Sequence, residues 1–137
     1  MAKSYEFVTL DVFTDRRFGG NPLAMRAGIE TLKIMQEDGL LANAEAVGAT
    51  LRGALSEGLA SVSGVVEIRG QGLMLGIELD RPCGAIWTRA AEAGLLLSVT
   101  ADSVIRLVPP LIMTEIEADD IVAILVPLIK TFLAEKP

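Results

Sequence analysis

The side chains that most often carry catalysis are scarce in this chain of 137 residues. It has no histidine, so the commonest general base and every histidine-dependent triad are excluded. Its one cysteine, Cys83, excludes an intramolecular disulfide and a cysteine-based zinc site. A Schiff-base lysine needs a depressed pKa, which is not expected of lysines near the termini or on helix surfaces: Lys3, Lys33, Lys130 and Lys136. The sequence therefore predicts no catalytic residue and no metal ligand.

Two other groups of polar residues are candidates for ion-binding sites. The stretch "GGNP" precedes an expected helix and follows Arg16 and Arg17, which suits an anion. Pro22 removes one backbone donor, however, and the phosphate-loop signature is missing. Four acids gather in a predicted first helical turn without calcium-loop spacing, which is more typical of a solvated helix face: Glu115, Glu117, Asp119 and Asp120.

Short helices and strands must position any site. Tyr5–Phe13 alternates apolar side chains and predicts a strand that is integral to the fold. The elements expected after it are, in order, helices over 22–38 and 41–59, strands Val65–Arg69 and Leu73–Leu79, a helix over 82–94, strands over 95–99 and 104–107, and a last helix of about twenty residues. Thr114 and Glu117, three residues apart, predict a capping box at the beginning of that last helix. Pro127 predicts a kink in that last helix.

This order, β α α β β α β β α, predicts an α+β fold in a single domain of residues 1–137. We expect a two-layer sandwich in which a small, mainly antiparallel sheet is covered by helices.

The composition limits the partners. A net charge of −6 disfavours nucleic acid and anionic membranes, which both need a basic surface. No apolar run is long enough to span a bilayer, and acids interrupt the N-terminal stretch where a signal core would lie. We therefore expect a cytoplasmic protein, or one made only by recombinant expression.

Four motifs carry a resemblance to a known family: "FGGNPLA", "RGQGLMLGIEL", "RPCGAIWTRAAEAGLLLSVTADSVIRLVPPL" and "TEIEADDIV". On these motifs, residues 19–137 resemble the C-terminal small domain of the class III, pyridoxal-phosphate-dependent aminotransferases, in particular their acetylornithine aminotransferase branch. The resemblance implies a small sheet covered by helices.

The same resemblance implies which site residues are present. In that family the Schiff-base lysine and the carboxylate for the cofactor ring nitrogen precede "FGGNPLA", and neither has a counterpart in this chain. A phosphate-binding threonine directly precedes "FGG" in the family, where this chain has Arg17. No cofactor is therefore expected. Arg106, in "VIRLVPPL", matches the family arginine that binds the substrate carboxylate. The alternative is that Arg106 is a surface strand residue with no pocket opposite it.

The N-terminal residues 1–24 resemble a different family, the phenazine-biosynthesis isomerase-like proteins of the diaminopimelate-epimerase fold, through "YEFVTLDVFTDRRFGGNPLA". Both families contain "GGNPLA". This favours an engineered or recombinant chimera with a grafted strand and turn over 1–18, a crossover over 19–24 and an aminotransferase-like segment over 25–137. Such a chimera is expected not to be an enzyme. The alternatives are a residual module that binds pyridoxal phosphate or an amino-acid carboxylate, and a protein-interaction module.

Self-association, most simply as a homodimer, is also expected. Hydrophobic residues make up 51% of the chain and charged residues only 22%, so covering every apolar patch within one copy is difficult. Exchange of the N-terminal strand through "TDRRFGGN" is one version of this dimer. The opposing interpretation is that the net charge of −6 keeps the chain monomeric.

Overall fold

The computed structural model describes residues 22–135. The chain divides into two compact units, Met1–Asp38 and Gly39–Pro137. The predicted strand Tyr5–Phe13, the arginines Arg16 and Arg17, and the residues Gly19–Asn21 lie outside the described residues. The described part of the first unit is one helix, and the second unit contains the sheet and three further helices.

Helix α1, Pro22–Glu37, agrees with the helix predicted over 22–38. It ends where Gly39 takes a left-handed backbone conformation with φ of +63°, which glycine adopts without a Cβ penalty. Two i,i+4 ion pairs run along its exposed surface, Arg26–Glu30 at 3.4 Å and Lys33–Glu37 at 3.8 Å.

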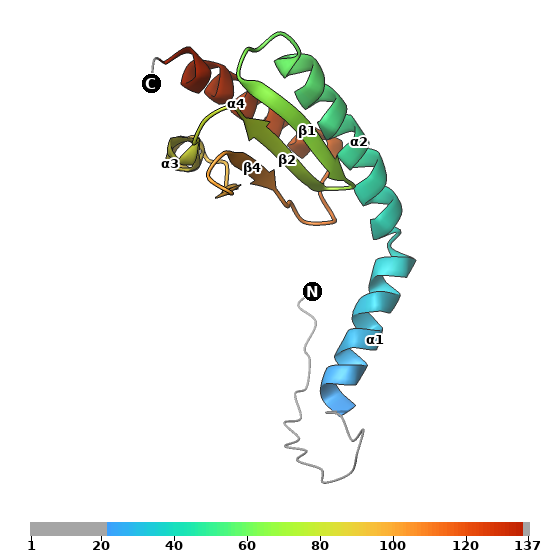
Figure 1. The fold of residues 1–137 in the computed structure, drawn as a ribbon. Coiled ribbons are helices and arrows are strands. Elements are labelled where there is room, and N and C mark those ends of the chain that lie inside the picture. The colour runs from blue at the N-terminus through green and yellow to red at the C-terminus, as the bar shows by residue number, and fades with distance from the viewer. Residues whose placement is uncertain (1–21, 136–137) are drawn as a thin grey trace. The chain divides into compact units, whose positions relative to one another are not determined.

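A four-stranded sheet forms the centre of the second unit (Figure 1). Its strands lie in the order β1-β2-β4-β3, and every neighbouring pair is antiparallel. The mainly antiparallel α+β prediction is confirmed at this level. The strands are β1 Val65–Gln71, β2 Met74–Leu79, β3 Ser98–Thr100 and β4 Val104–Leu107.

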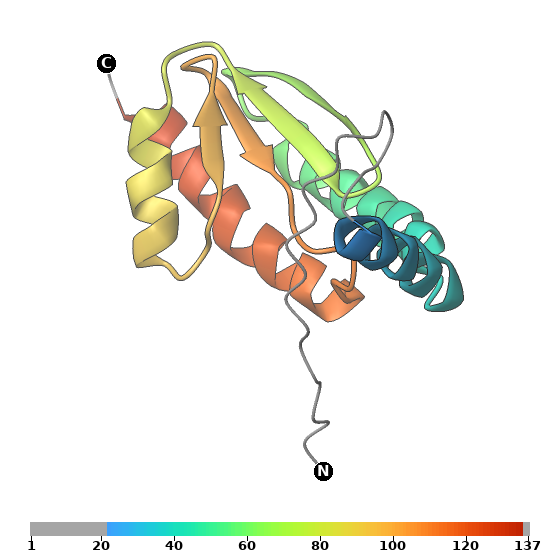
Figure 2. The same ribbon diagram turned by 90° about the horizontal axis from the view of Figure 1, so that it is seen from below.

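Three helices pack with this sheet, as the view from below shows (Figure 2): α2 Leu40–Leu59, α3 Gly84–Glu92 and α4 Glu115–Ala134. Alternate residues of the central strands are buried, for example Ile77 in β2 and Ile105 in β4. They join one core with the apolar stripes of α2 and α4, represented by Leu51 and Leu125. The side chains on the opposite face of the sheet are therefore available for a site.

The hairpin between β1 and β2 packs closely against α2. Gln71 pairs with Met74, and Gly72 between them has a left-handed φ of +52°. A Cβ at Gly48 of α2 would overlap the carbonyl oxygen of Gly72 and lie 2.9 Å from its Cα. Glycine at position 48 therefore permits a helix–turn contact that no other residue would permit.

The strand predicted over 95–99 is wrong for its first three residues. Helix α3 ends in a Schellman motif, in which Gly94 N–H donates to Ala91 O at 3.1 Å and Leu95 N–H donates to Ala90 O at 2.8 Å. Gly94 has the left-handed φ of +85° that this motif requires. Because the Leu95 amide belongs to the helix end, β3 begins only at Ser98.

Two large apolar side chains, Trp87 and Leu41, are exposed on helices of the second unit. Trp87 has an exposed fraction of 56%, because the buried face of α3 is centred on Ile86 and Ala90, four residues apart. Leu41 is 67% exposed near the start of α2.

Helix α4 begins with the predicted capping box, which is confirmed. Glu117 N–H donates to Thr114 Oγ1 at 3.3 Å, and Thr114 N–H donates to Glu117 Oε2 at 2.8 Å. The helix continues through Pro127, so the proline does not divide it. Across residues 22–135, no helix is both long and apolar enough to cross a membrane.

Candidate carboxylate-binding site

Arg106 lies on the sheet face away from α2 and α4. Its neighbours in β4, Ile105 and Leu107, are buried in the core, and side chains alternate along a strand, so the Arg106 side chain takes the opposite face. It is exposed there. The short strand "VIRL" thus places a guanidinium outside the core by alternation alone.

The register of the sheet aligns Arg106 with a residue from each other strand. Ser98 of β3 is its partner on one side, Gly76 of β2 is its partner on the other, and Arg69 of β1 pairs with Gly76. Arg106 Nε donates to Ser98 Oγ at 3.1 Å, which orients the guanidinium. Two arginines therefore flank a glycine across three neighbouring strands.

The glycine leaves space between the arginines. A hollow of about 300 Å³ is lined by Arg69, Met74, Gly76, Val104 and Arg106, among others. Arg106 also borders a second hollow of about 210 Å³, with Leu96 and Val108 on its wall. The guanidinium thus borders two shallow hollows on this face of the sheet.

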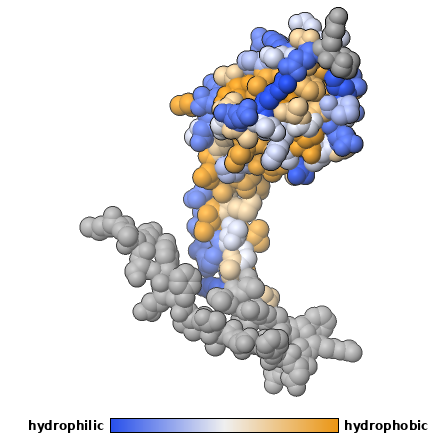
Figure 3. Space-filling model, turned by 90° about the vertical axis from the view of Figure 1, so that its left-hand side faces the viewer, coloured by the Kyte–Doolittle hydropathy of each residue, from blue (hydrophilic) through white to orange (hydrophobic). Residues whose placement is uncertain are grey.

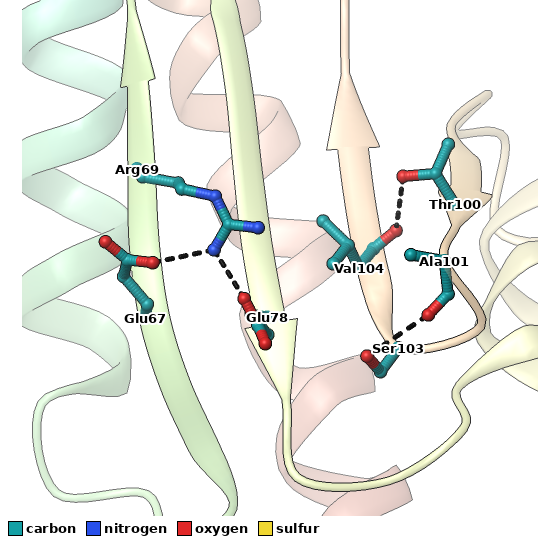
Figure 4. Close-up of polar contacts among 7 residues, drawn as sticks. All are labelled: Glu67, Arg69, Glu78, Thr100, Ala101, Ser103 and Val104. Carbon is teal, nitrogen blue, oxygen red and sulfur yellow. Dashed lines mark hydrogen bonds and ion pairs between the residues drawn. The ribbon is translucent and has the colours of Figure 1, made fainter.

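The two arginines differ in their charge partners. Arg69 Nη1 contacts Glu67 Oε2 at 2.7 Å and also binds Glu78 (Figure 4), and these hydrogen bonds raise the pKa of Arg69. Arg106 has no carboxylate partner among residues 22–135. An incoming carboxylate would therefore compete with two glutamates at Arg69 but with none of the described acids at Arg106.

The other candidate groups do not assemble with Arg106. Lys33 and Lys130 are exposed on α1 and α4, and Lys33 pairs with Glu37. Cys83 is fully buried, and burial raises the pKa of its thiol, which disfavours the reactive thiolate. Glu117 is engaged in the capping box, and the described residues contain no group of three or more potential metal ligands. Lys3 and Lys136 lie outside the described residues.

Sequence reasoning missed Ser98, Gly76 and Arg69 as neighbours of Arg106. Ser98 and Arg106 lie on two consecutive predicted strands, so their pairing in a hairpin could have been predicted from the sequence. Gly76 and Arg69 come from an earlier hairpin, and only the strand order β1-β2-β4-β3 brings them beside β4.

The fold is that of a small α+β unit with an antiparallel sheet and an exposed arginine on one face, and comparison with known proteins gives its family. The family described as "Aminotransferase class-III" matches residues 13–129. The chain belongs to the class III aminotransferase family.

Curated relatives agree with this assignment. The chain is 60% identical over 119 residues to "Acetylornithine aminotransferase 1" of Bordetella bronchiseptica, covering 87% of this chain and 30% of the relative. It is 44% identical over 98 residues to the acetylornithine aminotransferase of Methanosarcina acetivorans, covering 72% of this chain and 24% of the relative. The chain therefore spans less than a third of the length of these relatives.

Solved structures give the same result. Ornithine delta-aminotransferase of Plasmodium falciparum superposes with a TM-score of 0.80 at 32% identity, covering 93% of this chain and 34% of that one. Acetylornithine aminotransferase of Elizabethkingia anophelis superposes with a TM-score of 0.77 at 30% identity, covering 90% of this chain and 32% of that one.

These matches correct two predictions. The family match begins at residue 13, before the predicted crossover at 19–24, so the prediction of an engineered chimera with an isomerase-like protein is wrong. The prediction that the chain is not an enzyme is contradicted as well, because its curated relatives are acetylornithine aminotransferases. Of the functions considered from the sequence, the alternative, a binding module derived from acetylornithine aminotransferase, agrees better with these matches.

Pyridoxal phosphate is the cofactor that the resemblance implies for the family, and the described residues do not fit its covalent attachment. A Schiff-base lysine needs a buried or cationic setting. Lys33 and Lys130 are both exposed, on α1 and α4. No step of a reaction is therefore assigned to these lysines.

Proposed function

We propose that the second unit, Gly39–Pro137, forms the part of the substrate site that binds the substrate carboxylate in an aminotransferase of the acetylornithine or ornithine type. Arg106 is the residue that binds the carboxylate. The observation that carries this proposal is that Arg106 is oriented by Ser98 beside two hollows while no described acid neutralises it. The names of the relatives, acetylornithine and ornithine aminotransferases, support an amino-acid substrate.

Chemically, this part of the chain binds and orients rather than transfers a proton. A planar guanidinium presents two parallel N–H donors to a carboxylate, which fixes both the position and the orientation of the bound acid. The apolar residues Leu96 and Val108, on the second hollow, would then face the rest of the ligand. The catalytic groups of the proposed enzyme are not assigned to this part of the chain.

We also propose that the chain self-associates. Support for self-association comes from large apolar side chains that stay exposed on the second unit: Leu96, Ile112 and Ile116 are 87%, 70% and 75% exposed. Hydrophobic surface is also visible in the space-filling view (Figure 3). Sedimentation equilibrium at micromolar concentration tests this point, and a constant mass of 14.5 kDa would refute it.

Side-chain NMR of the arginine Nε–Hε groups tests the role of Arg106 directly. We expect N-acetylornithine to shift the Arg106 resonance in a saturable way, and its methyl ester, which lacks the carboxylate, to leave it unchanged. In the variants the backbone amide resonance of Ser98 reports binding: its saturable shift should be absent in Arg106→Gln and weaker in Arg106→Lys, because a lysine ammonium cannot form the bidentate pair.

Arg52→Gln is the matched control. Arg52 also lacks a described carboxylate partner, but its Nη1 donates to Gly70 O at 3.2 Å and it borders a different hollow. Binding by Arg52→Gln should equal that of the wild type. Equal weakening in Arg52→Gln and Arg106→Gln would mean that the carboxylate responds only to net charge, and the proposal would fail.

A further inference from the structure

A separate hollow of about 550 Å³ lies between the beginning of α3 and the turn that joins β3 to β4. Trp87 and Pro82 border it on one side, and Val99 and Asp102 border it on the other. The two sides are joined by a hydrogen bond in which Cys83 N–H donates to Asp102 O at 2.8 Å. The hollow, here called the α3 groove, is thus held by backbone contacts and does not involve Arg106.

An aromatic surface forms one side of the α3 groove. Trp87 is 56% exposed, although Ile86 beside it is fully buried. An indole is the best aromatic platform for a cation, because the ring quadrupole places negative potential on its face. Trp87 therefore gives the groove a surface that attracts positively charged groups.

A carboxylate borders the same groove. Asp102 is exposed, and its side chain makes no ion pair or hydrogen bond to the residues of the described range. The two arginines on the neighbouring segments are already engaged: Arg81 Nε binds Asp80 at 2.8 Å, and Arg89 Nη1 binds Glu135 at 2.7 Å. Neither of these cations is available to neutralise Asp102.

The turn that carries Asp102 has an unusual backbone. Ala101 and Asp102 are consecutive non-glycine residues with left-handed φ angles of +48° and +60°. Ser103 N–H donates to Ala101 O at 2.7 Å, and Thr100 Oγ1 donates to Val104 O at 3.5 Å. Figure 4 draws Thr100, Ala101, Ser103 and Val104. Such conformations cost energy and persist where the surrounding contacts determine them, often at binding sites. The backbone that carries Asp102 is therefore held in a defined conformation beside the groove.

We propose that the α3 groove binds an organic cation, an alkylammonium or a guanidinium group. The cation lies over the Trp87 indole, its charge faces the Asp102 carboxylate, and its alkyl part contacts Val99 and Pro82. This site takes a cation, whereas the proposed site at Arg106 takes an anion, and Ser98, which orients Arg106, also borders the α3 groove.

The single tryptophan of the chain makes the test direct, because all tryptophan fluorescence comes from Trp87. Tetramethylammonium chloride is titrated at constant ionic strength against sodium chloride, and tert-butanol serves as the neutral probe of similar shape. We expect a saturable change in fluorescence with tetramethylammonium and none with tert-butanol. An equal response to both probes would overturn the proposal.

Two variants separate the groove from general charge effects. Asp102→Asn keeps the left-handed turn, because asparagine tolerates that conformation, but removes the charge, and should weaken the affinity about two- to fivefold. Asp120→Asn, which removes an exposed carboxylate from α4, should leave the affinity unchanged. Unchanged affinity in Asp102→Asn, or equal weakening in both variants, would refute the role of Asp102.

Trp87→Leu tests the platform without altering the turn. The Val99 methyl resonances report binding in this variant, which has no tryptophan. Their saturable shift with tetramethylammonium should weaken about two- to fivefold relative to the wild type. Retention of the wild-type affinity would exclude a cation site on the indole, independently of any result at Arg106.

Discussion

Replacing Gly48 by alanine tests the contact between α2 and the β1–β2 hairpin. A Cβ at this position would overlap the carbonyl oxygen of Gly72, and it would lie within 2.9 Å of the Gly72 Cα. Real Cβ atoms essentially never come within 3.0 Å of such neighbours. Because the obstacle is backbone, no rotamer change relieves it, and the helix and the hairpin must separate.

The expected magnitude comes from a comparison within the same helix. Gly53 of α2 is exposed and has nothing within 4 Å of an added Cβ, so Gly53→Ala should stabilise the fold by up to about 1 kcal/mol through helix propensity. Gly48→Ala gains the same propensity but loses about 1–3 kcal/mol or more through overpacking. The propensity gain cancels in the difference, so Gly48→Ala should be less stable than Gly53→Ala by about 1–3 kcal/mol or more.

Urea unfolding followed by circular dichroism measures this difference. Gly58→Ala provides an intermediate case, because its Cβ would meet Val126 Cγ2 at 3.0 Å, which is a side chain that can move. The expected order of the free energy of unfolding is Gly53→Ala, then Gly58→Ala, then Gly48→Ala. Equal stability of Gly48→Ala and Gly53→Ala would show that the hairpin does not pack on α2 as described.

Three further predictions concern α4 and the core. Thr114→Ala should lower the free energy of unfolding by about 1 kcal/mol in the same urea assay, because the capping box is lost. The control Thr50→Ala loses only a hydrogen bond to Ala46 O in its own helix, so it should change the free energy of unfolding by at most about 0.5 kcal/mol. Hydrogen bonds from the Thr114 backbone and side chain lower the pKa of Glu117 below its ordinary value of 4.5. The charged Glu117 carboxylate therefore stabilises the folded state above pH 4.5, and this stabilisation is lost as the pH falls through the lowered pKa. The difference in unfolding midpoint between the wild type and Glu117→Ala should therefore shrink below about pH 4.5, and a difference that grows on acidification would contradict this sign. Cys83 should react with iodoacetamide much more slowly in the native state than in denaturant, because its thiol is fully buried and burial raises the pKa of the thiol. Mass spectrometry can follow the reaction, and equal rates in the two states would show that the thiol is not buried.

The helices and the first hairpin of the second unit follow from local patterns. The three-to-four spacing of Val47, Leu51 and Leu55 predicts the buried stripe of α2, and the alternation around Ile77 predicts β2. The capping box at Thr114 is visible because its two residues are three apart. Each of these signals is carried by residues near one another in the chain.

The sheet face that carries the site depends on contacts between distant segments, and it could not be predicted in the same way. Arg69 and Arg106 become neighbours of Gly76 only because β4, rather than β3, pairs with β2. The left-handed backbone of Ala101 and Asp102 also gives no sequence signal, since glycine or asparagine, not alanine, is the usual residue there. The prediction of a chimera was wrong for a different reason: it assigned residues 1–24 to another family on a short resemblance, whereas the match to the aminotransferase family begins at residue 13.

The two arginines beside Gly76 show why the position of a residue in a sheet does not establish its role. Both are exposed, both pair directly with the same glycine across neighbouring strands, and both border the same hollow. Two glutamates on the same face hold the guanidinium of Arg69, and these bonds would have to be broken before a ligand could bind there. Only a neutral hydroxyl, that of Ser98, holds Arg106, which fixes its orientation and leaves its positive charge uncompensated by any described acid. This difference in charge partners is the reason why the proposed carboxylate site is placed at Arg106 and not at Arg69.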